Sequence, residues 1–320
     1  MVTMNDIAKA MGVSRTTVSF VLNDRYKDVQ VSESLACRVR ETAERMGYVR
    51  NKLMDSVVTG KSNVIAIISA FHDFIMPMIA GCIEEAAKHG YVIKLIPLDA
   101  DVNKAIRQAV EFRVAGVFVN SLSHDLLQKV DPKFFSYGIP SLGLTPYSGR
   151  MAFDQKRSAG RGTEYLIRSG HRRIIFYSST SEISHERENG YREVMERYGL
   201  ESVILLDLDF LKQEDLFEEI LAFRPDAVQC YSDYYALYLM HYCYWKRLFI
   251  PETFSLLGFG NISGGRHASP HLTTIDEPYY EEGQLIFSRI RSMIETGKDL
   301  ECELKIGEVI ERESVQIKNN

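Results

Sequence analysis

The first 60 residues of the chain carry helical patterns of apolar positions and no strand pattern. Thr3 and Asp6 lie three residues apart around the start of the first apolar run, which is typical of a helix N-terminus with a capping box. Gly12 then ends this helix, and Ser14 is placed to cap a second one. A third helix is predicted over Ser32–Met46. Its apolar face consists of Leu35, Val39, Ala43 and Met46.

Beyond residue 60, short apolar runs alternate with amphipathic helical stretches. The runs predicted as strands are Val64–Ile68, Val92–Ile96, Gly116–Val119, Ile174–Tyr177, Val203–Leu206, Ala227–Tyr231 and Phe254–Leu257. The predicted helices are Met76–His89, Lys104–Arg113, Ser184–Tyr198, Glu214–Phe223 and Tyr234–Lys246. This alternation indicates parallel sheets with helices on both faces. Because roughly 260 residues exceed one doubly wound layer, we expect two lobes with a cleft between them.

The spacing of small and apolar residues in the head matches a helix-turn-helix. Counted from Met4, Ile7 is the fourth residue, Ala8 the fifth and Gly12 the ninth. Val13, Val18 and Val21 follow at the tenth, fifteenth and eighteenth positions. The small Ala8 lets two helices cross closely, Gly12 supplies a positive φ, and the valines form a shared core. An arbitrary helical hairpin is the alternative, which six matches at fixed offsets disfavour.

The second helix of such a motif enters the major groove of DNA with its N-terminal residues nearest the bases. Arg15 and Thr16 occupy these positions, and an arginine is suited to bidentate contact with a guanine. The hydroxyls expected at phosphates are those of Thr3, Ser14, Thr17 and Ser19, although each of them has helix capping as an alternative role. Phe20 either contacts a thymine methyl group or packs inside the head.

Composition and charge fit a nucleic-acid-binding head on a separate body. The chain is 45% hydrophobic and 25% charged, as globular proteins are. Residues 1–61 contain ten Lys or Arg and seven Asp or Glu, whereas the remainder contains 28 and 36, so a weakly basic head adjoins an acidic body. Without an apolar run of eighteen residues or a secretion signal, the protein is expected to be cytoplasmic. Its five scattered cysteines are expected to be isolated thiols.

Sequence motifs typical of enzymes are either absent or lack the structural context that their chemistry requires. Gly258 and Gly260 lie near Gly264 like part of a dinucleotide-binding loop, but the third glycine is misplaced and Pro270 interrupts any following helix. Pro270 also separates His267 from His271, which argues against a metal pair on one helix. Because GxSxG, HExxH and P-loop motifs do not occur, we expect no catalytic residue, metal or cofactor. A two-lobed solute-binding protein without a DNA role is the remaining alternative, and the head argues against it.

The head resembles the signature of the LacI/GalR family of bacterial transcriptional regulators. The matching segments are Val2-Thr-x-x-Asp-Ile-Ala8, Gly12-Val-Ser14, Thr17-Val-Ser19, Val21-Leu-Asn23 and Met46-Gly-Tyr48. The body matches in order at Gly170-His-Arg-Arg-Ile174, Arg187-x-x-Gly-Tyr191, Pro225-Asp-Ala-Val228, Ile250-Pro-Glu252, Leu256-Leu-Gly-Phe259 and Leu272-Thr-Thr-Ile275. The resemblance therefore spans essentially the whole chain. It implies a repressor with a periplasmic-binding-protein-like body that binds a palindromic double-stranded operator as a homodimer, with Asn23 and Tyr48 also at the DNA.

The resemblance also predicts the domain boundaries of the chain. It implies a helix-turn-helix head over 1–49, a hinge helix and linker over 50–61, and an effector-binding and dimerisation body over 62–320. We expect an N-lobe of 62–157 plus 279–303 and a C-lobe of 158–278 plus 304–320. In the hinge, Val57 stands where family members carry a leucine that wedges into the central base step, and Asp55 would repel phosphate. These departures argue against a kinked central step.

By the same resemblance, a small-molecule effector lies between the lobes. Arg187 is the first candidate contact, because its donors can hold a pair of sugar hydroxyls or a carboxylate. Asp233 is the second, as an acceptor from hydroxyls, with surface ion pairing as the alternative for both. The other candidates are His72, Phe74, Asp154 and Tyr234. Ser232 and Gly260 replace polar residues usual in the family, so a sugar-like effector is expected without a defined specificity.

Overall fold

The computed structural model describes residues 2–49, 62–98, 101–120, 123–144, 153–208 and 213–318. The chain divides into two compact units, Met1–Ser62 and Asn63–Asn320, which are the head and the body. The hinge segment predicted over 50–58, with Val57, lies outside the described residues.

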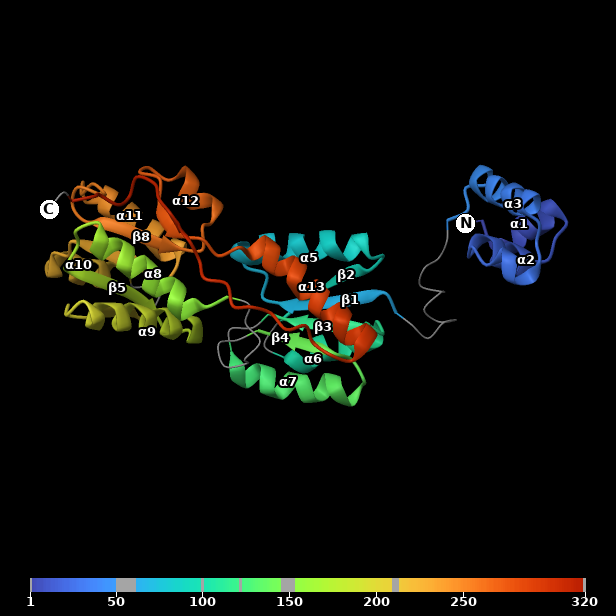
Figure 1. Ribbon diagram of the computed structural model, residues 1–320, viewed down its shortest axis with the longest axis horizontal. Coiled ribbons are helices and arrows are strands. Elements are labelled where there is room, and N and C mark those ends of the chain that lie inside the picture. Colours follow the sequence, from blue (N-terminus) through green and yellow to red (C-terminus); the bar gives the residue numbers. More distant parts are fainter. Residues whose placement is uncertain are drawn as a thin grey trace. The chain divides into compact units, whose positions relative to one another are not determined.

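The head is a small bundle of helices (Figure 1). Its elements are α1 (Met4–Met11), α2 (Arg15–Leu22), the one-turn η1 (Tyr26–Val29) and α3 (Glu33–Arg45). The predicted capping box is confirmed, because Thr3 Oγ1 accepts from the amide of Asp6 at 3.3 Å and the Asp6 carboxylate accepts from the amide of Thr3 at 2.9 Å. Gly12 ends α1 with a φ of 65°, which confirms the tight turn before α2.

The core of the head contains the residues that the helix-turn-helix spacing predicted, with one change on α3. Ile7, Val18 and Val21 are fully buried. On α3 the buried side chains are Ala36, Val39, Thr42 and Ala43, whereas Leu35 and Met46 are only half-buried. The predicted face of α3 is thus rotated, because small side chains lie where the helix crosses its neighbours most closely.

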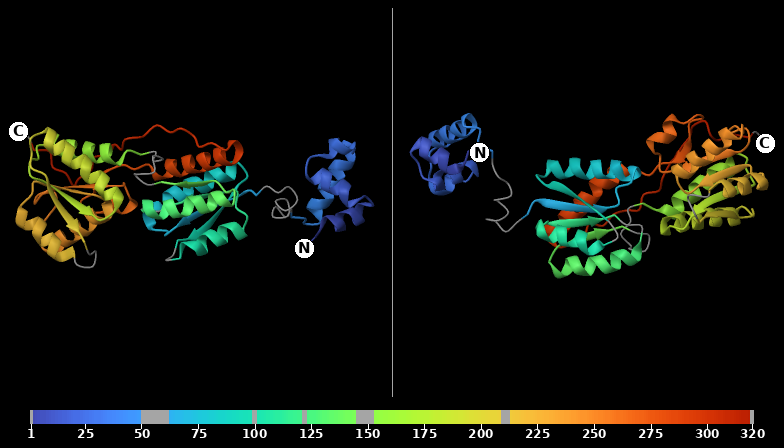
Figure 2. Two further views of the ribbon diagram at one scale, coloured as in Figure 1. Left: turned by 90° about the horizontal axis from the view of Figure 1, so that it is seen from below. Right: turned by 180° about the vertical axis from the view of Figure 1, so that it is seen from behind.

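The N-lobe of the body is a four-stranded parallel sheet between two layers of helices (Figure 2). Its strands, in the order β2-β1-β3-β4, are β1 (Val64–Ser69), β2 (Val92–Pro97), β3 (Gly116–Val119) and β4 (Ser141–Gly143). The helices are α5 (Met76–Lys88), preceded by the one-turn η2 (Asp73–Ile75), then α6 (Val102–Glu111), α7 (His124–Ser136) and α13 (Tyr279–Thr296). Ile65 and Ile67 of β1 pack against α5 and α13, and Ala66 and Ile68 pack toward α6 and α7.

The C-lobe repeats this layered arrangement around a six-stranded sheet. Its strands, in the order β10-β9-β8-β7-β5-β6, are β5 (Ile174–Ser179), β6 (Val203–Asp207), β7 (Ala227–Cys230), β8 (Ser255–Phe259), β9 (Thr273–Ile275) and β10 (Val309–Ile310). All pairs are parallel except β10 with β9. The helices are α8 (Gln155–Arg168), α9 (Glu182–Arg197), α10 (Gln213–Phe223), α11 (Asp233–Trp245) and the short α12 (Ser263–His267). The predicted fold class, a helical head with two doubly wound parallel sheets, is confirmed.

Helices α8 and α9 cross unusually closely on one face of the C-lobe. A Cβ atom added at Gly190 of α9 would overlap the backbone carbonyl oxygen of Lys156 on α8. At Gly160 of α8, an added Cβ atom would lie 3.2 Å from the carbonyl oxygen of Gly190. The absence of a side chain at these two positions therefore sets the distance between the two helices.

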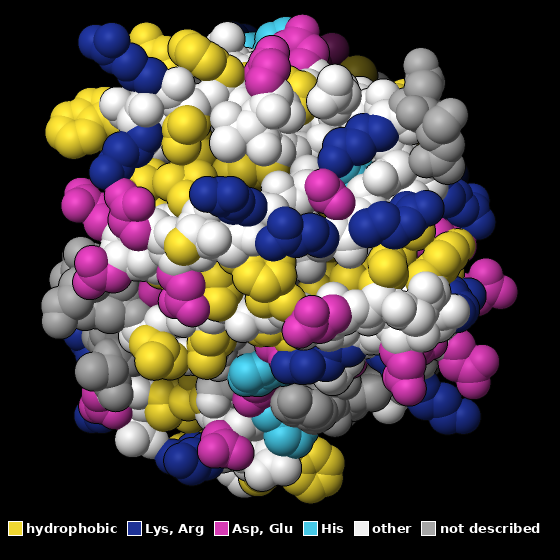
Figure 3. All heavy atoms as spheres, turned by 90° about the vertical axis from the view of Figure 1, so that its left-hand side faces the viewer, with side chains coloured by type: hydrophobic (Ala, Val, Ile, Leu, Met, Phe, Trp, Pro, Cys, Tyr) yellow, Lys and Arg dark blue, Asp and Glu magenta, His cyan; other side chains and the backbone are white. Residues whose placement is uncertain are grey.

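The surface of the C-lobe is mixed in character. In Figure 3, Lys and Arg side chains are interspersed with Asp and Glu and with hydrophobic side chains. Trp245 and Tyr244, at the end of α11, are among the exposed large hydrophobic residues. Within the described part of the chain, none of the helices is both long and apolar enough to cross a bilayer.

Candidate functional site

The N-terminal turn of α2 presents the two residues predicted to read bases. Arg15 and Thr16 are exposed, while Val18 and Val21 on the opposite side of α2 are buried in the core of the head. The two side chains therefore project outward from the turn that a helix-turn-helix places nearest the base edges.

The hydroxyl groups predicted to contact phosphates make local hydrogen bonds. Ser14 Oγ accepts from the amide of Thr17 at 3.0 Å and lies 2.8 Å from Thr17 Oγ1. The hydroxyl of Thr3 donates to Asp6 at 2.7 Å, and Asn23 Nδ2 donates to Ser19 Oγ at 3.3 Å. These residues cap and brace the ends of α1 and α2. A hydroxyl still has acceptor capacity after one such bond, so the capping role is compatible with the predicted contact.

Phe20 and Tyr48 are half-buried in the head. The ring of Phe20 lies 5.5 Å from the guanidinium carbon of Arg25, and Tyr48 packs against the core of the head. The ring of Phe20 is thus partly packed beside Arg25 and partly exposed, and its contact with a thymine methyl group stays a prediction.

A cavity of about 690 Å³ lies between the two lobes of the body, where the carboxyl ends of several strands meet. The N-lobe contributes residues from η2, α5, β3 and the start of α13, and the C-lobe contributes residues from α9, α11 and the ends of β7 and β8. Its lining is Phe71, His72, Asp73, Phe74, Ile75, Met78, Phe118, Asn120, Leu144, Ser181, Ile183, Arg187, Tyr231, Ser232, Tyr234, Tyr235, Tyr238, Phe259, Gly260, Ile262, Glu277, Tyr279 and Glu282. This lining contains four of the predicted effector contacts: His72, Phe74, Arg187 and Tyr234.

Aromatic side chains from both lobes meet at this cavity. The rings of His72 and Phe74 are stacked, with centroids 5.7 Å apart and planes 8° from parallel. Phe74 lies 6.5 Å from Tyr234 of the C-lobe, in an edge-to-face arrangement, and 6.2 Å from Tyr279. These contacts connect the lobes through rings, which suits a ligand with a flat or apolar body.

Arg187 lies in the wall of the cavity but is only 4% exposed, because its donors are engaged with the protein. Its Nη2 donates to Glu277 Oε2 at 2.8 Å, and its Nε donates to Gln155 Oε1 at 2.8 Å. Its Nη1 donates to the carbonyl of Tyr231, and its guanidinium carbon lies 3.5 Å from the ring centroid of Phe259. The sequence analysis gave a surface ion pair as the alternative role of Arg187, and Arg187 does form an ion pair, but this pair is buried. Arg187 joins α9 to the segment that follows β9.

Asp233 and Asp154 lie outside the lining of this cavity. Asp233 is fully buried at the start of α11, where it accepts from Thr274 Oγ1 at 2.6 Å and from the amide of Ile262 at 2.8 Å. Burial raises the pKa of its carboxyl group to about 6, against the lowering effect of these hydrogen bonds. Asp233 thus connects the start of α11 to β9 and to the loop after β8.

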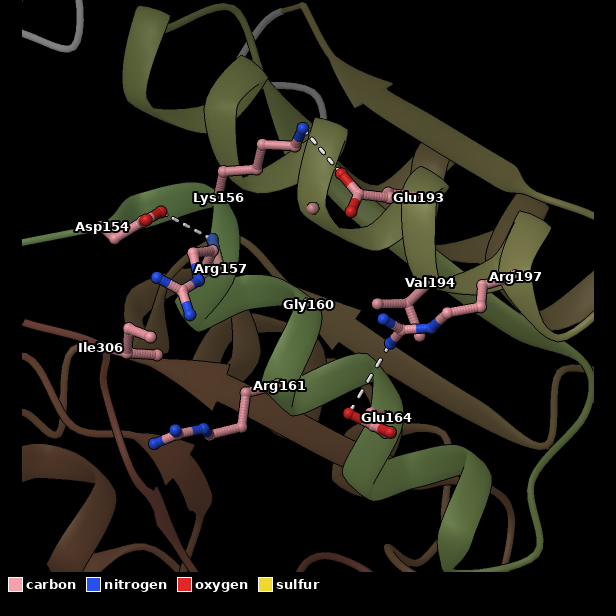
Figure 4. A pocket seen from close by; sticks show the side chains of 11 residues that line it. Asp154, Lys156, Arg157, Gly160, Arg161, Glu164, Glu193, Val194, Arg197 and Ile306 are labelled. Carbon is pink, nitrogen blue, oxygen red and sulfur yellow. Dashed lines mark hydrogen bonds and ion pairs between the residues drawn. The ribbon is translucent and has the colours of Figure 1, made fainter.

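Asp154 instead caps α8 and borders a second hollow on the outside of α8 and α9 (Figure 4). Its carboxylate accepts from the amide of Arg157 at 2.8 Å. Ion pairs cross this hollow, with Lys156 Nζ 2.7 Å from Glu193 and Arg197 Nη2 3.7 Å from Glu164. Because these groups are largely exposed and paired with each other, the hollow is a solvated surface groove, and the interlobe cavity is the better binding site.

Three carboxylates in the cavity were missed by the sequence analysis: Asp73, Glu277 and Glu282. Glu277 is buried and accepts from Arg187, from Gln155 Nε2 at 2.8 Å and from the hydroxyl of Tyr279 at 2.8 Å. Burial, with the neighbouring charge of Glu277, raises the pKa of Glu282 to about 8, against the lowering effect of Arg289. The position of Glu277 just after a strand was a usable signal, since strand ends meet at such clefts.

Both units of the chain match models of known protein families. The family model described as "Bacterial regulatory proteins, lacI family" matches residues 3–51, and the "Periplasmic binding protein-like domain" matches residues 163–315. The first match covers the helix-turn-helix, and the second covers most of the C-lobe. The chain belongs to the LacI family.

Relatives of this LacI-family chain match over nearly its full length. The HTH-type transcriptional repressor PurR of Vibrio cholerae is 27% identical, over 99% of this chain and 98% of the relative. The ribose operon repressor of Escherichia coli is 26% identical, over 89% of this chain and 91% of the relative. These relatives are regulators, and LacI-family regulators are not enzymes.

Solved structures of LacI-family proteins share the fold. The Lac repressor dimer bound to operator and an anti-inducer has a TM-score of 0.84 at 20% identity, covering 98% of this chain and 99% of that one. A LacI-family regulator from Enterococcus faecium with bound ribose has a TM-score of 0.70 at 21% identity, covering 80% of this chain and all of that one. Among the residues described for the present LacI-family chain, His, Cys, Asp and Glu side chains form no cluster suited to a metal ion.

Proposed function

We propose that this LacI-family protein is a transcriptional repressor whose affinity for a palindromic operator is controlled by a small molecule bound between the lobes of its body. The outward projection of Arg15 and Thr16 from a capped α2 is the observation that carries the proposal. The protein acts as a homodimer in the cytoplasm, with the head over 1–49 and the hinge over 50–61, so that two heads meet two half-sites.

The effector site of this proposal is the 690 Å³ cavity, with Phe74, His72, Tyr234 and Arg187 at its wall. A sugar or sugar derivative is the effector class that the sequence predicted. Support comes from the ribose bound to the Enterococcus faecium regulator and from the name of the ribose operon repressor.

Selection of duplexes from a random library tests the DNA-binding part of the proposal. We expect a symmetric consensus of about 14–20 base pairs and an affinity that falls steeply as salt rises. Recovery of no symmetric sequence, or of no DNA at all, would favour the alternative of a small-molecule binding protein without a DNA role.

Replacing Arg15 by alanine should relax base preference at one position of each half-site, with a loss of about 1–3 kcal/mol for the preferred sequence. The measurement is the affinity for the consensus and for each single-base variant of it. Arg40→Ala is the control, because Arg40 is an exposed arginine of the head that is already paired with Asp24 at 2.7 Å. An equal loss for every sequence in Arg15→Ala would identify Arg15 as a phosphate contact instead.

A further inference from the structure

Acidic side chains outnumber basic ones in the lining of the interlobe cavity. Its lining contains the carboxylates of Asp73, Glu277 and Glu282, and among the described lining residues Arg187 is the only Lys or Arg. Asp73 comes from η2 of the N-lobe, and Glu282 comes from the first turns of α13. Carboxylates therefore reach the cavity from two separate elements of the fold.

Arg187 does not offset this charge for an incoming ligand. All three of its nitrogens donate hydrogen bonds within the protein, and its charge is balanced by Glu277 at 2.8 Å. An anionic ligand would have to separate this buried pair, which is costly because it leaves a charge without its partner. The pair thus contributes no net charge to the cavity, which leaves the carboxylate of Asp73 and the largely protonated carboxyl group of Glu282.

The side chains of Asp73 and Glu282 have no polar partner among the described residues. Within the described residues, no hydrogen bond or ion pair is made by either side-chain carboxylate. Burial and the nearby Glu277 raise the pKa of Glu282 to about 8, opposed by Arg289. A half-buried carboxylate in this environment is poorly stabilised as an anion, and a cation beside it would supply the missing stabilisation.

Aromatic rings line the same cavity as these carboxylates. The ring of Phe74 lies 6.5 Å from that of Tyr234 and 6.2 Å from that of Tyr279, and the other aromatic rings of the lining belong to Phe71, His72, Phe118, Tyr231, Tyr235, Tyr238 and Phe259. The faces of such rings attract ammonium groups, and their apolar area stabilises a flat or cyclic body. A cavity with aromatic walls and carboxylates that have no polar partner suits a ligand that carries both a ring and an ammonium group.

We infer that the cavity binds a small organic cation, in which an ammonium group is attached to an aromatic or sugar-like ring, in preference to neutral or anionic compounds of the same shape. This inference rests on the proposed function, since it names the chemical class of the effector. The ammonium group lies at Asp73 and Glu282, and the ring packs against the aromatic lining that includes Phe74 and Tyr234. Amino sugars and arylalkylamines are members of this class.

Two series of compounds matched in shape and differing in charge test the inference on the full-length protein. One series is 2-phenylethylamine, 2-phenylethanol and phenylacetate, and the other is glucosamine, glucose and glucuronate. We expect at least one of the amines to raise the Tm in a thermal-shift assay, and the alcohol, sugar and carboxylates to raise it less. Equal or greater stabilisation by the neutral or anionic member, or no stabilisation by either amine, would overturn the inference.

Variants that remove one carboxylate each locate the ammonium group. Glu282→Gln and Asp73→Asn should each weaken amine binding about tenfold in calorimetry and leave binding of the neutral compound unchanged. Glu281→Gln is the matched control, because Glu281 is the adjacent exposed carboxylate of α13 and does not line this cavity. If all three variants bind the amine as the parent does, the ammonium group does not lie at these carboxylates and the inference is wrong.

Proton release gives a second readout. The groups acting on the Glu282 carboxyl are Glu277, which disfavours its ionisation, and Arg289, which favours it. Because its pKa of about 8 keeps Glu282 largely protonated at neutral pH, binding of 2-phenylethylamine, which stays an ammonium ion over this range, should release up to about one proton and strengthen as the pH rises toward 8. Calorimetry in buffers of different ionisation enthalpy measures this release, which Glu282→Gln should abolish. Amine binding without proton release in the parent protein would argue against the placement of the ammonium group.

Experiment can reject the proposed function and this inference independently of each other. Operator binding is measured on the same protein preparations without any amine. A protein that binds its operator but no amine retains the proposed DNA-binding role and loses the inference. A protein that binds amines but no DNA loses the proposed function, while the chemistry of the cavity stands.

Discussion

The Arg187→Met variant is expected to lose about 3–5 kcal/mol of unfolding free energy, because it removes one partner of a buried ion pair. Methionine retains much of the side-chain volume, so the loss reports mainly the charge and the hydrogen bonds. Glu277 would keep its bonds from Gln155 and Tyr279 but would have no cation beside it. Urea unfolding followed by circular dichroism measures the effect.

Two comparisons separate this charge effect from a simple packing defect. A lone buried carboxylate is relieved when it takes up a proton, so the loss should be smaller at about pH 5 than at about pH 8. Adding Glu277→Gln to Arg187→Met should recover part of the stability for the same reason. A double variant that is less stable than Arg187→Met at both pH values would contradict the argument.

The Gly190→Ala variant is expected to lose about 3 kcal/mol or more, since its Cβ atom would overlap the Lys156 carbonyl oxygen and push α8 away from α9. A backbone atom cannot move aside as a flexible side chain can. The clash therefore exceeds the gain of about 1 kcal/mol that alanine brings to a helix. The measurement is again the free energy of unfolding, with proteolysis of the C-lobe as a second probe.

Gly160→Ala is the control for this prediction, because it makes the same chemical change on the facing helix. An alanine Cβ atom there lies 3.2 Å from the nearest backbone atom, so a shift of a few tenths of an ångström accommodates it. We expect a change within about 1 kcal/mol, as the helix propensity of alanine offsets the tight contact. Similar losses in the two variants would show that the helix crossing is more adaptable than its geometry suggests.

The βα alternation in the sequence was sufficient to predict much of the body, but it missed α7, α8, α12, α13, β4, β9 and β10, and some of these omissions have clear physical reasons. The pattern located β1, β5 and α9 within a few residues of their observed bounds. Helix α8 was missed because the face it buries consists largely of small residues such as Ala159, Gly160 and Thr163, which leave little hydrophobic periodicity. Helix α7 contains Pro132, which sequence rules treat as a helix breaker, and β4 has only three residues.

The candidate site was predictable where a local motif marks it and unpredictable where the fold assembles it. The motif around Arg187 led to the cavity, but its partner Glu277 is 90 residues away along the chain. The position of Asp233 after β7 was interpreted as a position in the cleft, whereas its side chain turns toward Thr274 and Ile262. The direction of a side chain at the end of a strand depends on neighbouring loops, which periodicity does not describe.

The buried network of Arg187, Gln155 and Glu277 has a consequence for how this protein diversifies. Arg187 and Glu277 of this network line the cavity from α9 and the segment after β9, whereas Asp73 and Phe74 line it from a one-turn helix of the N-lobe. Asp73 makes no hydrogen bond or ion pair within the described residues, so a substitution there is expected to change the lining of the cavity while the hydrogen bonds among Arg187, Gln155 and Glu277 are retained. Selection on such positions can then alter the cavity without rebuilding the buried network.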